Sequence, residues 1–265
     1  MKVSFIGSGN VAWHLAQFFE EKGHIICEIY SRDMLNAKAL VKKLFDTTAV
    51  SNLDFSDSVA QLFVLAVNDD AIPEVLEQLE LPPNSILVHT SGAKSIDLLE
   101  NWLQEFDINN VNIGVFYPLM TFTKTTKLTI KEIPFCIEAT DKLTENLLVQ
   151  AAQKMSNIVY LVDSNERKIL HLIAVFANNF VNHLIAISQD ISETNELDFN
   201  LLRPIILETV NKAIAAEDVH SMQTGPARRG NQKIIKSHLE ILKNEPNHEK
   251  IYRVLSESIF NQFNH

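Results

Sequence analysis

The chain has 265 residues, of which 46% are hydrophobic and 21% are charged, a composition typical of a soluble globular protein long enough for two domains. Its formal net charge of -10 at pH 7 argues against a general nucleic-acid-binding protein, which needs a basic surface. Met1 runs directly into an apolar stretch, so we expect no cleaved leader and a cytoplasmic protein. Cys27 and Cys136 lack metal-type spacing and are expected to be reduced.

The N-terminal segment predicts a dinucleotide-binding βαβ unit. An apolar run, Lys2 to Ile6, leads into Gly7-Ser8-Gly9-Asn10-Val11-Ala12 and then into a helical pattern. The first glycine allows a tight turn, the second lets the backbone approach a pyrophosphate, and the small third residue permits close helix packing. The helix N-terminus adds a favourable field for the phosphates. We expect a cofactor to contact Gly7, Ser8, Gly9, Asn10 and Val11; the alternative is a plain turn without a ligand.

The end of the second predicted strand, Ile25 to Tyr30, selects the cofactor. Enzymes that prefer NAD usually carry an acidic residue there, which binds the ribose 2′-hydroxyl. Here Ser31 and Arg32 follow Tyr30, and a hydroxyl with a guanidinium suits a 2′-phosphate. NADP is therefore favoured over NAD, with Tyr30, Ser31 and Arg32 in the site. Alternatively, Arg32 is a solvated residue at the start of the next helix.

From Met1 to about Asp163, short apolar runs alternate with helical patterns, which predicts an α/β domain with a doubly wound, mostly parallel Rossmann sheet over residues 1–163. The further strands are expected at 48–50, 62–67, 86–89, 112–116, 134–138 and 158–162. The helices are expected at 10–22, 34–45, 71–79, 96–106 and 142–155, the last after a cap at Asp141.

After Asp163 the strand-like runs stop, and an all-α domain is expected over residues 164–265. Its helices are predicted at about 165–192, 200–219, 231–243 and 248–263. The first is apolar but is interrupted by His171, Asn178, Asn179, Asn182 and His183, so we interpret it as a core helix and not as a membrane span. Because so small a domain is so rich in apolar residues, we expect a homodimer.

Several motifs occur in a fixed order and carry a resemblance to a known family. They are Asn68-Asp69-Asp70-Ala71-Ile72, His89-Thr90-Ser91-Gly92-Ala93, Gly114 to Phe122, the helix from His171 to Phe180, and Thr224-Gly225-Pro226-Ala227-Arg228-Arg229-Gly230-Asn231. Over nearly its whole length the chain resembles Rossmann-like proteins with a C-terminal helical domain of unknown function, which are labelled NADP-dependent oxidoreductases. It is more distantly similar to pyrroline-5-carboxylate reductases and β-hydroxyacid dehydrogenases, which pair a dinucleotide domain with a helical substrate and dimerisation domain.

The chain departs from these relatives at three positions. The resemblance to β-hydroxyacid dehydrogenases implies a catalytic Lys four residues before an Asn, but Val175 stands four residues before Asn179. In the resembled family a His often stands at the place of Tyr117 and an Asp at that of Asn231. Roles that the relatives assign to those positions therefore do not transfer directly.

Ligands of open parallel sheets collect at the carboxyl ends of the strands, which brings the loops after several strands together. This places Asn68, His89, Ser91 and Tyr117 near the nicotinamide side of the cofactor. Asn68 and Asp69 are expected to contact the cofactor, although the same residues suit a helix N-cap. The Ser91 hydroxyl is expected to polarise a substrate carbonyl, although a simple turn is the alternative.

A helical wheel places His171, Asn178 and Asn182 in one stripe, with Asn179 on the same side. Such groups either hydrogen-bond within the protein or face a polar ligand, and we expect His171 and Asn179 to be catalytic. The loop from Thr224 to Asn231 offers two guanidiniums for an anionic group, or it is only a connector between helices.

These observations favour an oxidoreductase that transfers hydride between NADPH and a small polar carbonyl or imine, possibly one bearing an anionic group. Ser91 and Asn179 would polarise the acceptor and His171 would supply the proton; no metal is expected. The alternative is a dinucleotide-binding redox sensor or interaction protein without turnover. Reduction of a deazaflavin-type cofactor is a third possibility.

Overall fold

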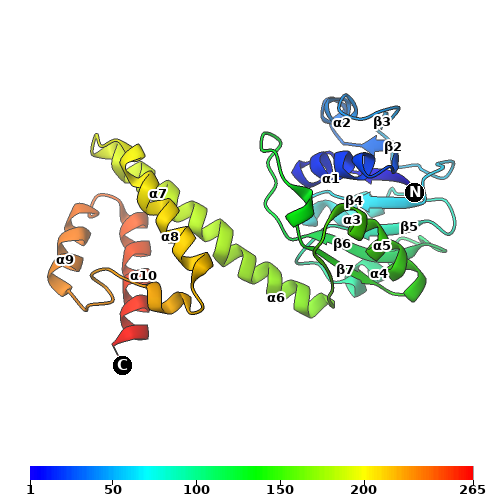
Figure 1. The fold of residues 1–265 in the computed structure, drawn as a ribbon. Coiled ribbons are helices and arrows are strands. Elements are labelled where there is room, and N and C mark those ends of the chain that lie inside the picture. The colour runs from blue at the N-terminus through cyan, green and yellow to red at the C-terminus, as the bar shows by residue number, and fades with distance from the viewer. Residues whose placement is uncertain (265) are drawn as a thin grey trace. The chain divides into compact units, whose positions relative to one another are not determined.

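The computed structural model describes residues 1–264. Its N-terminal part is an α/β sheet domain and its C-terminal part is helical, as predicted (Figure 1). The strands are β1 (Lys2–Ile6), β2 (Ile25–Tyr30), β3 (Thr48–Val50), β4 (Leu62–Leu65), β5 (Ile86–His89), β6 (Asn112–Pro118), β7 (Phe135–Ala139) and β8 (Val159–Leu161). The helices are α1 (Asn10–Glu21), α2 (Met34–Val41), α3 (Ile72–Leu76), α4 (Ile96–Glu105), α5 (Lys142–Met155), α6 (Ser164–Ala174), α7 (Val181–Thr194), α8 (Arg203–Ala215), α9 (Gln232–Ile241) and α10 (Pro246–Phe263).

The eight strands form one sheet in the order β3-β2-β1-β4-β5-β6-β7-β8. All neighbours are parallel except β6 and β7, which are antiparallel. The strand order reverses between β1 and β4, and at such a switch point a crevice opens beyond the carboxyl ends of the strands. The predicted doubly wound, mostly parallel sheet is therefore confirmed.

Period-two alternation of apolar side chains fixes which face each strand residue covers. On β4, Leu62 and Val64 pack in one buried cluster with α1, α2 and α5, whereas Phe63 and Leu65 pack in the other with α3 and α4. Each face of the sheet thus has its own helical layer. The predicted Asp141 cap is also confirmed, because its carboxylate accepts hydrogen bonds from the backbone N–H groups of Leu143 and Thr144.

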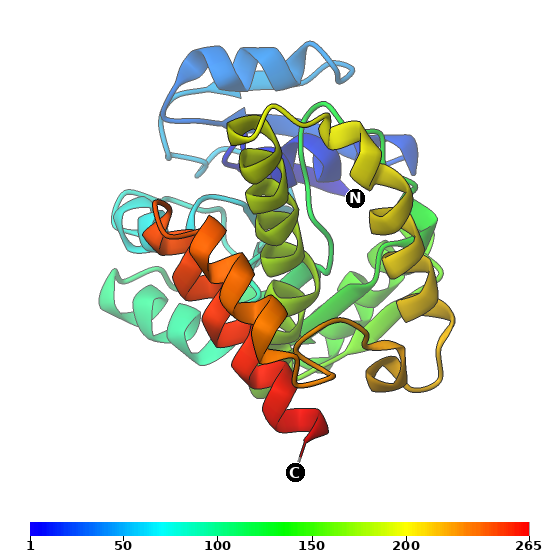
Figure 2. The ribbon, with the colours of Figure 1, turned by 90° about the vertical axis from the view of Figure 1, so that its left-hand side faces the viewer.

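Contacts within the chain divide it into two compact units, Met1–Asn179 and Phe180 onward. The sheet unit, defined by these contacts, therefore includes α6, although the predicted domain boundary lies before it, at residue 163. That residue 163 separates a cofactor domain from a substrate domain stays a prediction. In the second unit, α9 and α10 pack against each other (Figure 2).

The segment Ser164–Thr194 is one continuous 31-residue helix, within which residues Val175–Phe180 form a π turn. By length and composition alone it could cross a membrane, and none of its apolar window is buried within the chain. A π turn uses i to i+5 hydrogen bonds, so the residues beyond it are rotated relative to a regular helix. Side-chain directions predicted from a regular helical wheel therefore shift beyond Val175, and the common stripe of His171, Asn178 and Asn182 stays a prediction.

Candidate functional site

The glycine turn after β1 is shaped by a close approach of two backbones. Gly7 has φ of 117°, and a Cβ atom there would lie 2.5 Å from the carbonyl oxygen of Ala66, so only glycine fits. Gly9 is the N-cap of α1, which has no side-chain cap and no acidic residue in its first turn among the described residues. The first N–H groups of a helix lack intrahelical partners, so this helix start favours an anion.

A first cavity of about 280 Å³ lies at this turn. The predicted cofactor residues Gly7, Ser8, Gly9, Tyr30, Ser31, Arg32 and Asn68 all line it. The Ser8 hydroxyl donates a hydrogen bond of 2.9 Å to the Ser31 hydroxyl, which joins the glycine turn to the end of β2. Asn68 makes no side-chain cap for the following turn, so the helix-cap alternative is not what the structure adopts.

Arg32 is exposed and makes no ion pair within the described part of the chain. Its neighbour Asp33 is occupied as the N-cap of α2, where it accepts a hydrogen bond from the N–H of Leu35. A second cation, Lys124, lines the same cavity from the loop after β6, and its ammonium lies 5.1 Å from the centre of the Trp13 ring. Sequence reasoning missed Lys124, because a loop lysine so far along the chain carries no local signal.

A second cavity, of about 590 Å³, lies beside the first turn of α1 and is lined by Asn10, Val11, Tyr117, His171 and Asn179, among others. The predicted cofactor residues Asn10 and Val11 thus line this cavity and not the first one. The predicted catalytic residues His171 and Asn179 are brought together here. Asn178 also lines the cavity, whereas Asn182 belongs to the second unit.

His171 of α6 and Tyr117 of β6 form the polar centre of the second cavity. The Tyr117 hydroxyl lies 3.3 Å from Nδ1 of His171, and the two rings meet edge to face. Burial raises the pKa of Tyr117 to about 12, so its hydroxyl keeps its proton at neutral pH. Gly92 packs against both side chains, since a Cβ atom there would lie 2.7 Å from Nδ1 of His171 and 2.8 Å from Cζ of Tyr117.

The Ser91 side chain forms hydrogen bonds within the protein and lines neither cavity. Its hydroxyl donates to a carboxylate oxygen of Asp69 at 2.8 Å and accepts from the N–H groups of Ala93 and Lys94. Asp69 likewise lines neither cavity. The two residues hold the loop that carries Gly92, and direct contact with a substrate or cofactor stays a prediction for both.

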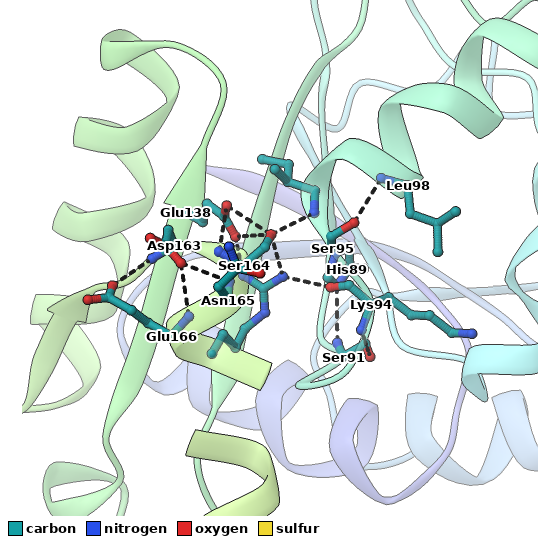
Figure 3. A network of polar contacts seen from close by, with 12 residues as sticks. His89, Ser91, Lys94, Ser95, Leu98, Glu138, Asp163, Ser164, Asn165 and Glu166 are labelled. Carbon is teal, nitrogen blue, oxygen red and sulfur yellow. Dashed lines mark hydrogen bonds and ion pairs between the residues drawn. The ribbon is translucent and has the colours of Figure 1, made fainter. Parts of the chain in front are cut away.

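A buried network fixes the start of α6 on the sheet (Figure 3). The guanidinium of Arg167, which is fully buried, forms an ion pair with Glu138 of β7 and donates a 2.6 Å hydrogen bond to the carbonyl of Lys94. The Ser164 hydroxyl donates to the same carboxylate and accepts from the N–H of Ile96 at the start of α4. Sequence reasoning missed Arg167, although it stands four residues before His171 and so on the same helix face.

His89 lies at the end of β5 beneath this network. It accepts a 3.2 Å hydrogen bond from the N–H of Ser91. Burial, and next the positive charge of Arg167, lower the pKa of His89 to about 3. The imidazole is therefore neutral at physiological pH, and Arg167 keeps Glu138 as its anionic partner.

The loop from Thr224 to Asn231 makes local contacts in the second unit, and an anion-binding role for it stays a prediction. The Arg228 guanidinium donates to the carbonyl of Gln223 and lies 5.0 Å from the centre of the Phe263 ring. Asn231 caps α9 by accepting a hydrogen bond from the N–H of Ile234. Arg228 is thus engaged within its own unit.

Arg167→Met should lower the free energy of unfolding by about 3 to 5 kcal/mol, because it leaves the Glu138 carboxylate without its buried partner. The free energy of unfolding should fall clearly less in the double variant Arg167→Met with Glu138→Met, because no buried charge is left without a partner. The matched control is Arg253→Met, which removes the exposed pair with Glu249 and should cost at most about 1 kcal/mol. Urea unfolding measures all three, and equal losses in the single and double variants would contradict this account.

Two family models match the chain, and the second begins within the sheet unit, just before β7. A Rossmann-like domain matches residues 1–105, and the family described as "Domain of unknown function (DUF2520)" matches residues 133–259. No curated protein matches significantly.

Three solved structures illustrate the relationship. The "putative NADP oxidoreductase BF3122" from Bacteroides fragilis is 34% identical, with 98% of each chain covered and a TM-score of 0.89. An imine reductase from Myxococcus stipitatus in complex with NADP+ is 14% identical over 98% of this chain and 92% of its own, with a TM-score of 0.64. A pyrroline-5-carboxylate reductase from Coxiella burnetii is 17% identical over 98% of this chain and 96% of its own, with a TM-score of 0.53. The last two proteins share only the fold with this chain, whereas the first is similar in both sequence and fold. The chain therefore belongs to the family of Rossmann-like proteins that carry a C-terminal DUF2520 domain.

Proposed function

We propose that this protein is an NADPH-dependent reductase of a small carbonyl or imine compound. The observation that carries the proposal is the adjacency of two cavities at the start of α1: Gly9 lines the first and Asn10 the second. A dinucleotide that follows the glycine turn would leave its phosphates in the first cavity and its nicotinamide toward the second. The NADP complex of the imine reductase, a protein of the same fold, supports this cofactor class.

The residues of the first cavity fit a phosphorylated dinucleotide. The uncapped start of α1 and the close approach at Gly7 suit the pyrophosphate. Ser31 and Arg32 offer donors for a 2′-phosphate, and Lys124 adds positive charge to the same cavity. The carboxylate of Asp33 is occupied elsewhere, so it does not compete for Arg32.

When bound, NADPH supplies a hydride to an electrophilic carbon. His171 would donate the accompanying proton to the oxygen or nitrogen of the substrate, and Asn179 would orient that atom by hydrogen bonding. Tyr117 keeps its hydroxyl proton and contacts Nδ1 of His171, so it fixes the orientation of the imidazole. Gly92 keeps the two side chains at this spacing, because any larger residue would overlap them.

Arg32→Gln should weaken NADPH binding about 10- to 100-fold and leave NADH binding nearly unchanged, since it removes charge-assisted hydrogen bonds to the 2′-phosphate. Lys38→Gln is the matched control, because it removes an exposed charge of α2 that does not line the cavity. Calorimetric titration measures the affinities. Equal wild-type affinity for the two nucleotides would refute the NADP preference, and no binding of either would refute the function.

His171→Asn should lower the rate of NADPH oxidation about 10²- to 10⁴-fold, because the proton donor is lost, without weakening NADPH binding. Tyr117→Phe should lower this rate less, because it removes only the hydroxyl that contacts the His171 imidazole and keeps the proton donor. His183→Asn serves as the control, since His183 lies on the same long helix but does not line the cavity. The assay is loss of NADPH absorbance with a panel of ketones, aldehydes and imines. Stoichiometric NADPH binding without oxidation by any acceptor would favour the redox-sensor alternative.

A second copy of the chain is our proposed partner, in a cytoplasmic homodimer. Apolar side chains are exposed on α7 and α8, among them Val181, Leu184, Ile205, Leu207 and Ile214. Exposed apolar surface of this extent marks an interface. The three amides at 178, 179 and 182 and the imidazole at 183 disfavour lipid as the covering phase.

Sedimentation at micromolar concentration should therefore give a dimer. Leu207→Glu, on α8, should shift it toward the monomer, because a carboxylate in the interface has no partner. Leu143→Glu, at an equally exposed position on α5 of the sheet unit, should leave the dimer intact. A purely monomeric wild-type protein would exclude this partner.

A further inference from the structure

We infer that the substrate taken by the second cavity is an uncharged, largely apolar carbonyl or imine compound. This inference rests on the proposed function and narrows its substrate class. It rests on two observations: the side chains that line the cavity, and the positions of Arg167, Arg32 and Lys124 outside it.

The lining of the second cavity is mostly apolar. Its apolar members include Val11, Leu119, Met120, Phe122, Leu170 and Ile173. Its polar members, Asn10, Tyr117, Thr121, His171, Asn178 and Asn179, are hydrogen-bonding groups of amide, hydroxyl or imidazole type. Among the described residues that line it, none is Asp, Glu, Lys or Arg. Such a mixture suits a neutral molecule held by shape and oriented by a few hydrogen bonds.

Arg167, Arg32 and Lys124 do not line this cavity. Arg167, one helical turn before His171, is fully buried and paired with Glu138. Arg32 and Lys124 line the first cavity. A substrate carboxylate in the second cavity would therefore lose hydration without gaining an ionic partner, which is costly.

The sequence assigns the possible anionic group of the substrate to the loop of Arg228 and Arg229, with Lys233 and Lys236 beyond it, and none of these four residues lines the second cavity. Arg228 is held in its own loop by the Gln223 carbonyl and the Phe263 ring. The cavity of about 590 Å³ lies within the usual range for small-molecule sites, and in the proposed function a small neutral substrate would share it with the nicotinamide ring.

The first test compares two ketones that differ only in charge: acetylcyclohexane and cyclohexylglyoxylate, which carries a carboxylate in place of the methyl group. Each is titrated calorimetrically into the full-length protein saturated with NADP+, so the readout does not need turnover. We expect the neutral ketone to bind at least about tenfold more tightly. Tighter binding of the carboxylate, or no binding of the neutral ketone, would overturn the inference.

The second test places a cation in the lining. Ile173→Lys should raise the affinity for cyclohexylglyoxylate relative to acetylcyclohexane about tenfold. Leu172→Lys is the matched control, because Leu172 is exposed to the same degree, 57% against 55%, but does not line the cavity. Ala177→Lys, also in the lining, replaces Ile173→Lys if that variant does not fold.

An unchanged ratio in the lining variant, or an equal change in Leu172→Lys, would mean that the ketones bind elsewhere and would overturn the inference. NADPH affinity is measured on the same samples. Failure to bind NADPH counts against the proposed function, whereas normal NADPH binding with a preference for the carboxylate counts against the substrate class alone.

Discussion

The buried ion pair between Arg167 and Glu138 is the constraint on which the candidate site depends. A guanidinium without access to water is tolerated only when anions and carbonyls surround it, and here the Glu138 carboxylate, the Lys94 carbonyl and the Ser164 hydroxyl do so. Those partners come from β7, from the loop before α4 and from α6 itself. The position of α6 on the sheet is therefore fixed at its first turns. His171 follows one turn later and meets Tyr117 and Gly92 as a consequence.

Charged side chains are distributed unequally between the two cavities that meet at the glycine turn. The first cavity is suited to an anion and the second to a neutral group. Arg32, Lys124 and the uncapped start of α1 gather positive potential in the first cavity, where an anion gains most from it. The second cavity has only neutral donors and acceptors around His171 and Tyr117. Hydrogen bonds there act in surroundings of low polarity and are stronger than in water. His89, which burial and Arg167 keep neutral, adds no competing charge beneath the loop that carries Gly92.

Local patterns in the sequence predict most of the sheet unit, because period-two alternation and the glycine turn are determined by neighbouring residues. The strands at 25–30, 48–50 and 86–89 and the helix at 142–155 match the structure at both ends. Contacts between distant segments carry no such pattern. The bond from Ser91 to Asp69, the pairing of Arg167 with Glu138 and the entry of Lys124 into the first cavity each join residues 22 or more positions apart. The π turn at Val175–Phe180 is also invisible to a regular helical wheel, so the wheel does not give the side-chain directions beyond it.

The π turn contains the position, four residues before Asn179, at which the resemblance to β-hydroxyacid dehydrogenases implies a catalytic lysine. Val175, which holds that place, lines the second cavity together with Asn179, so the position faces the site but offers no proton. Neither do the neighbouring lining residues Ala174 and Ala177. The imidazole of His171 also lines this cavity and has ring nitrogens that can donate or accept a proton, whereas the Tyr117 hydroxyl beside it keeps its own proton. In the proposed function, proton transfer would therefore run through His171, on the turn of α6 that follows Arg167, and the position of that donor would depend on a buried ion pair that does not line the cavity.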